Sequence, residues 1–105
     1  MAKRYPLKIT VLKKLSSKEV YGQPLSEVAE DMSPYCDRLE VGQAFIVEES
    51  GAMPSGFFTW AWHDIYLAMT GLRFGGNYPW IKKDGVIYSC CSDGARPVFF
   101  KLERL

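Results

Sequence analysis

The chain has 105 residues, the size of one ordinary domain, so we expect a single domain over residues 1–105. Hydrophobic residues make up 48% of the sequence and charged residues 24%, which is typical of a globular protein and not of a disordered one. The net charge of +1 argues against a dedicated nucleic-acid-binding protein. Neither an apolar run of about 18 residues nor a signal peptide is recognisable, so we expect no membrane span and a cytoplasmic location.

The charge is unevenly distributed along the chain. Residues 1–18 contain six basic residues and no acid, and residues 19–49 contain eight acids against the single base Arg38. Residues 50–105 contain six basic and four acidic residues. The simpler interpretation is that these charges complement one another in the fold or are solvated, and the alternative is a basic patch for an acidic ligand.

The first half predicts two strands and a short helix. Residues 6–14 alternate, with Leu7, Ile9 and Val11 on one face, and this period of two predicts a strand with one buried face. A polar connection over residues 16–24 follows, and then Ser26 is a candidate cap for a short helix at about 27–32 that Pro34 ends. Residues 43–49 predict a second strand.

The second half predicts the main helix and a hairpin. Apolar residues recur at helical spacing over residues 60–72, with Thr59 as a candidate cap, and little polar surface remains. Such a helix is buried on more than one side or covered by a partner chain, so we expect a homo-oligomer. Residues 86–91 and 97–103 predict an antiparallel hairpin joined by a turn at 92–95.

These elements together predict an α+β domain. We expect a small, mostly antiparallel sheet or partial barrel of about four strands, packed on one main helix (about 60–72), plus the short helix (about 27–32).

Several motifs occur in a specific order along most of the chain. They are Trp60-Ala61-Trp62-His63-Asp64-Ile65, then Phe74-Gly75-Gly76 with Pro79-Trp80, then Cys90-Cys91-Ser92-Asp93-Gly94-Ala95-Arg96-Pro97-Val98 through Arg104. With this order the chain resembles a family of small uncharacterised proteins, about 100 residues long, from anaerobic bacteria and archaea. The resemblance implies a single compact domain and life in an anaerobe's cytoplasm, and it brings no activity or cofactor. The position after Phe57 is often a cysteine in that family and is Phe58 here, so a thiol pair or metal site using that position is absent.

The cysteines and the one histidine are the candidate catalytic residues. Cys36, Cys90 and Cys91 are an odd number, which indicates free thiols in a reducing compartment. A reactive thiolate would be Cys91, or less favourably Cys90, with Arg96 lowering its pKa and His63 acting as a base that Asp64 or Asp93 orients. The simpler interpretation is one core cysteine, one half-buried cysteine and ordinary hydrogen bonds for His63 and Asp64.

A metal site built from Cys36, His63, Cys90 and Cys91 is not favoured. The sequence has no paired chelating spacing, and adjacent cysteines on a strand point to opposite faces. We therefore expect no metal and no cofactor.

Aromatic residues gather around the main helix and the loop that follows it. They are Trp60, Trp62, Tyr66, Tyr78 and Trp80, and with Arg96 they are candidate ligand-binding residues. Packing in the core is the simpler interpretation of such a group.

Three functions stay open from the sequence. The best supported is a binding or accessory module with an aromatic-lined pocket for a small ligand, between residues 60–72 and 74–80. The alternatives are a thiol-dependent enzyme or redox protein using Cys91 or Cys90 with His63, and a structural subunit of a larger complex.

Overall fold

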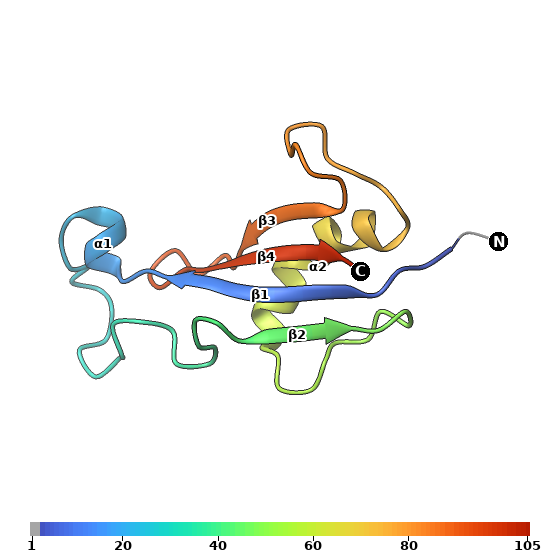
Figure 1. Ribbon diagram of the computed structural model, residues 1–105. Helices are drawn as coiled ribbons and strands as arrows, with labels where there is room; N and C mark the ends of the chain where they lie inside the picture. Colours follow the sequence, from blue (N-terminus) through green and yellow to red (C-terminus); the bar gives the residue numbers. More distant parts are fainter. Residues whose placement is uncertain (1–2) are drawn as a thin grey trace.

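A computed structural model describes residues 3–105, which form a four-stranded sheet crossed on one face by a long helix (Figure 1). In chain order the elements are β1 (Leu7–Lys14), α1 (Ser17–Tyr21), β2 (Ala44–Val47), α2 (Thr59–Arg73), β3 (Val86–Cys90) and β4 (Val98–Arg104). The strand order is β2-β1-β4-β3, and every neighbouring pair is antiparallel. The predicted α+β class is confirmed, and the sheet is open and not closed into a barrel.

The alternation of β1 explains how the sheet builds its core. Leu7, Ile9 and Val11 are buried, whereas Lys8 and Thr10 point to the other face and stay partly exposed. Ile9 is paired with Leu102 of β4, so apolar side chains of the two central strands lie side by side. The register shifts between Val11 and Lys13, as in a β-bulge.

Helix α2 covers the apolar face of the sheet with the stripe that its sequence predicts. Ala61, Ile65, Met69 and Leu72 are buried, and the helix packs on β3, β4 and β1. The N-cap residue is Phe58, which makes no side-chain capping bond, so the prediction of Thr59 as the cap is wrong. Within residues 3–105, no helix combines the length and the apolar character needed to cross a membrane.

The short helix lies earlier than the sequence analysis predicts. It is α1, at 17–21, and residues 27–32 form turns in which amides bond three residues back, as Met32 N does to Ala29 O at 3.1 Å. The reason is capping: the Ser16 side chain accepts from the Glu19 amide, and the Glu19 carboxylate accepts from the Ser16 amide. Both halves of a capping box are therefore satisfied at Ser16.

Candidate functional site

A cavity of about 320 Å³ lies beside the first turn of α2, and we call it the α2 cavity. Its floor is apolar and includes the buried side chains of Leu39, Ala61 and Val98. The remaining lining residues are aromatic, charged or thiol-bearing, and they are Phe58, Trp60, Arg38, Asp93, Arg96, Cys36 and Cys91. This combination of an apolar floor and a few polar groups is typical of small-molecule sites.

Two hydrogen bonds hold the start of α2 against the turn between β3 and β4. The Trp60 indole N–H donates to Ser92 Oγ at 2.9 Å, and the Ser92 amide donates to Asp64 Oδ2 at 2.7 Å. Asp64 therefore has the role of holding a loop amide, which is the simpler of its two predicted roles. The bonds fix the Trp60 side chain at the cavity, although 56% of the residue is exposed.

The charged residues come from the same turn and from the loop after Cys36. Asp93 Oδ1 accepts from the amides of Ala95 at 2.9 Å and Arg96 at 3.3 Å, which shapes the turn. Asp93 Oδ2 lies 3.9 Å from Arg96 Nε. The Arg38 guanidinium lies over the Phe58 ring, 5.2 Å from its centroid. The charged lining residues of the cavity are thus Arg38, Arg96 and Asp93, which give it a net positive charge.

The thiols are arranged differently from the catalytic prediction. Cys91 and Cys36 are buried, each 8% exposed, and Cys90 is the exposed cysteine. Cys90 is paired with Phe99 on the outer face, so Cys91 falls beside Val98 on the inner face, where the Val98 amide donates to Cys91 Sγ at 3.2 Å. The expectation that Cys91 faces outward is therefore wrong, and burial raises the pKa of its thiol; the reactivity of Cys91 stays a prediction.

The structure does not bring His63 to the α2 cavity that Cys91 lines. His63 is exposed and is not among the residues lining the α2 cavity. Successive helix residues are about 100° apart, so His63 lies about 160° around α2 from Ala61, which faces the cavity. This orientation of α2 places Asp64, but not His63, against the turn between β3 and β4.

Only two of the predicted ligand-binding residues, Trp60 and Arg96, line the α2 cavity. Trp62 packs edge-on against Phe57 and Tyr66, with ring centroids 6.1 and 5.7 Å apart. The Tyr78 hydroxyl donates to Ala68 O at 2.7 Å, so the loop after α2 is closed against the helix.

Trp80 completes this group at the other end of α2. It is 71% exposed beside the Tyr78 ring and lines a separate hollow with Tyr88 and Lys101. The α2 cavity lies at the opposite end of the helix from this group, so the pocket expected between α2 and residues 74–80 stays a prediction.

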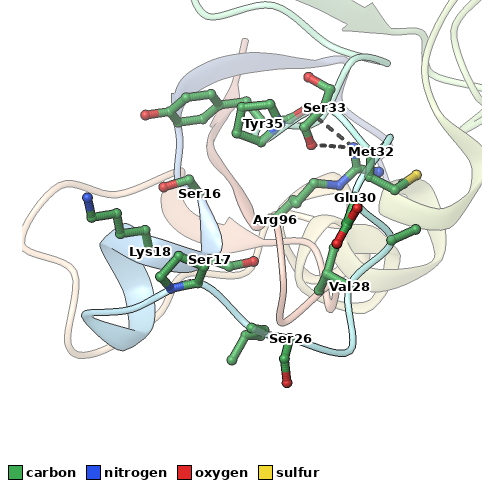
Figure 2. A pocket seen from close by; sticks show the side chains of 14 residues that line it. Ser16, Ser17, Lys18, Ser26, Val28, Glu30, Met32, Ser33, Tyr35 and Arg96 are labelled. Atoms are coloured by element: carbon green, nitrogen blue, oxygen red, sulfur yellow. Dashed lines mark hydrogen bonds between the residues drawn. The ribbon is translucent and has the colours of Figure 1, made fainter.

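A second, larger cavity of about 590 Å³ lies beneath the turns of residues 24–35. Figure 2 shows Arg96 reaching across to this segment, where its Nη1 donates to Ser33 O at 3.1 Å and Tyr35 O at 3.4 Å. Its serines also hold the fold: Ser16 caps α1, and Ser17 Oγ donates to Ala95 O at 2.6 Å. We regard the α2 cavity as the better candidate site, because it is built on a helix and a hairpin, whereas the larger cavity is lined mainly by turns.

Sequence reasoning missed Phe58 and Arg38 as lining residues. Arg38 carried a signal, because it is the single base in an acidic segment of the chain. For Phe58 the only signal was the family resemblance, in which the corresponding position is often a cysteine. Comparison of the chain with protein-family models, with curated proteins and with solved structures found no match.

Proposed function

We propose that the protein is a small-ligand binding module and that its site is the α2 cavity. One observation carries the proposal: aromatic side chains and two guanidiniums converge over an apolar floor in one hollow of about 320 Å³. That volume is within the range of small-molecule sites, which runs from about 300 to 1,000 Å³. The expected ligand is planar or apolar and has one anionic group.

Each part of the cavity has a role in this proposal. The Trp60 and Phe58 rings would contact the planar part of the ligand, and Arg38 would bind the anionic group. The Arg38 side chain is 67% exposed and its Nε lies 4.0 Å from the exposed Asp37 Oδ1, which is a weak competing interaction. Arg96 would add charge while keeping its bonds to the 33–35 backbone.

The test is a screen of aromatic carboxylates and phosphates by thermal shift and tryptophan fluorescence. A ligand that binds the folded state raises the melting temperature. Arg38→Ala should weaken binding by about 10- to 100-fold, since it removes a charge-assisted hydrogen bond worth about 1.5–3 kcal/mol. Trp60→Phe should keep part of the affinity and lose most of the fluorescence response.

Trp80→Ala is the matched control, because Trp80 is an exposed tryptophan outside the cavity. Binding should be unchanged in this variant. If no compound in the panel shifts the melting temperature, or if Trp80→Ala abolishes binding while Arg38→Ala does not, the α2 cavity is not the site.

We also propose that a second copy of the chain packs against the outer face of α2. Trp60 and Leu67 on this helix form an exposed stripe with Phe74, the C-cap residue that follows it, with exposed fractions of 56%, 83% and 47%. His63 and Thr70 fall between them, so the stripe contains no acidic residue, lysine or arginine. Its symmetry favours a second copy as the partner: Trp60 and Phe74 are each seven residues from Leu67, so an antiparallel pair centred on Leu67 would match them.

Sedimentation velocity over a range of concentrations tests this pairing. The wild-type protein should dimerise as concentration rises, and Leu67→Asp should keep it monomeric. Val41→Asp is the control, since Val41 is an apolar residue that is 57% exposed and is not part of the stripe. A protein that is monomeric at every concentration, or that dimerises equally well with Asp at 67, would contradict the proposal.

The three free thiols further support a reducing compartment such as the cytoplasm.

A further inference from the structure

The α2 cavity contains two thiols that small-ligand binding does not use. Cys36 and Cys91 come from distant parts of the chain, and each is 8% exposed. The loop that carries Cys36 is held in place from two sides. Lys14 Nζ donates to Cys36 O at 2.9 Å, and Arg96 Nη1 donates to Tyr35 O at 3.4 Å. The fold therefore keeps both sulfur-bearing side chains at one hollow.

Among the residues that the structure describes, the lack of further metal ligands beside Cys36 and Cys91 restricts which metal ion the two thiols could hold. Within residues 3–105, no group of three or more His, Cys, Asp or Glu side chains is placed to hold a metal ion. Asp93 lines the cavity, but its carboxylate is occupied by two backbone amides and by Arg96. A structural Zn²⁺ site takes four ligands, so Zn²⁺ does not fit. An ion that is satisfied by two sulfurs does fit, and thiolates select soft ions such as Cu(I).

The charge of the cavity suits the complex that this ion would form. One Cu⁺ replaces the protons of two thiols, giving a bis-thiolate with a net charge of −1 and two released protons, with no change of oxidation state. Arg38 and Arg96 outweigh Asp93 around it and would compensate that charge. The apolar floor, with Leu39, Ala61 and Val98 buried, limits access of water to the sulfurs.

We propose that Cys36 and Cys91 form a two-coordinate site for a soft monovalent metal ion, with Cu(I) as the preferred ion. The ion would lie at the floor of the cavity, between its two thiolates. The two sulfurs that would bind the ion are not among the groups proposed to contact the planar part of the small ligand, which are the Trp60 and Phe58 rings.

The decisive experiment uses Cys90→Ser protein, because Cys36 and Cys91 are then the only thiols in the chain. Reduced protein is titrated anaerobically with Cu(I) in competition with the chromogenic chelator bicinchoninate. We expect one Cu(I) per chain by native mass spectrometry, whether the protein is monomeric or paired through α2, and two sulfur neighbours by X-ray absorption. In the wild-type background, Cys36→Ser and Cys91→Ser should each lose the ion to the chelator.

The outcomes separate this site from the other proposals. Trp60→Phe should leave Cu(I) binding unchanged while it alters ligand binding, so the two proposals can fail independently. The proposal would be overturned if Cys90→Ser protein yielded all its Cu(I) to the chelator. It would also be overturned if X-ray absorption found only one sulfur bound to the copper. A complex in which the metal bridges two chains would also overturn it.

Discussion

Replacing Gly71 with Ala tests how the loop after α2 is closed against the helix. A Cβ at this position would lie 2.6 Å from the Tyr78 hydroxyl oxygen and 3.3 Å from its Cζ. The hydroxyl donates to Ala68 O at 2.7 Å, so it cannot move away without losing that bond. Gly71→Ala therefore sets the helix propensity of alanine against the packing of Tyr78.

The two effects have opposite signs and can be estimated. Alanine in place of glycine inside a helix stabilises by about 1 kcal/mol. Displacing Tyr78 costs about 1 kcal/mol for the hydrogen bond, and about 1–2 kcal/mol more for the lost contacts of its half-buried ring. We expect Gly71→Ala to lower the free energy of unfolding by about 1–2 kcal/mol. In Tyr78→Phe protein, where the hydroxyl is absent, the same change should be near neutral or stabilising.

Urea denaturation of the wild-type protein, both single variants and the double variant gives the coupling between the two positions. We expect a coupling energy of about 1–3 kcal/mol, within the range for residues in contact. If Gly71→Ala stabilised the protein by the same amount with and without the Tyr78 hydroxyl, Tyr78 would not pack on α2.

Three further predictions concern α1 and the cysteines. Ser16→Ala should lower the free energy of unfolding by about 1 kcal/mol in urea denaturation, and an unchanged value would mean that α1 adds no stability. The Tyr35 hydroxyl, and then Ser16, hold the pKa of Glu19 below its ordinary value of 4.5. That contribution to stability is present above 4.5 and is lost as the pH falls through the lowered pKa, so Tyr35→Phe should flatten the acid limb of a stability–pH curve, and an unaltered curve would refute the pairing. Iodoacetamide should label Cys90 in the native protein and Cys91 only after unfolding, as peptide mass mapping would show; equal native labelling would contradict the assigned strand faces.

Much of the fold could be predicted because periodicity reports which side chains share a face. The alternation of Leu7, Ile9 and Val11 and the helical stripe through Ala61 and Ile65 both correspond to buried residues. The short helix could not be placed this way, because its start depends on capping and not on periodicity. The sequence analysis considered Ser26 alone, whereas the reciprocal bonds between Ser16 and Glu19 start the helix at 17, and at 27–32 the chain forms turns.

The site was harder to predict because it depends on how elements are rotated against one another. Alternation assigned Cys90 and Cys91 to opposite faces, but only the pairing of Cys90 with Phe99 shows that Cys91 faces α2. The rotation of α2 likewise decides that Ala61 and not His63 faces the cavity. Neither the strand pairing nor the rotation of the helix can be read from the local sequence.

The order of the strands also has a consequence for biosynthesis. β1 and β4, the first and last strands, pair along the centre of the sheet. While the chain is still being translated, the apolar side of β1 has no central neighbour until Phe100 and Leu102 have emerged from the ribosome. The sheet therefore cannot form until β4 has been synthesised, and a nascent chain stalled before β4 would expose an apolar strand to chaperones and proteases.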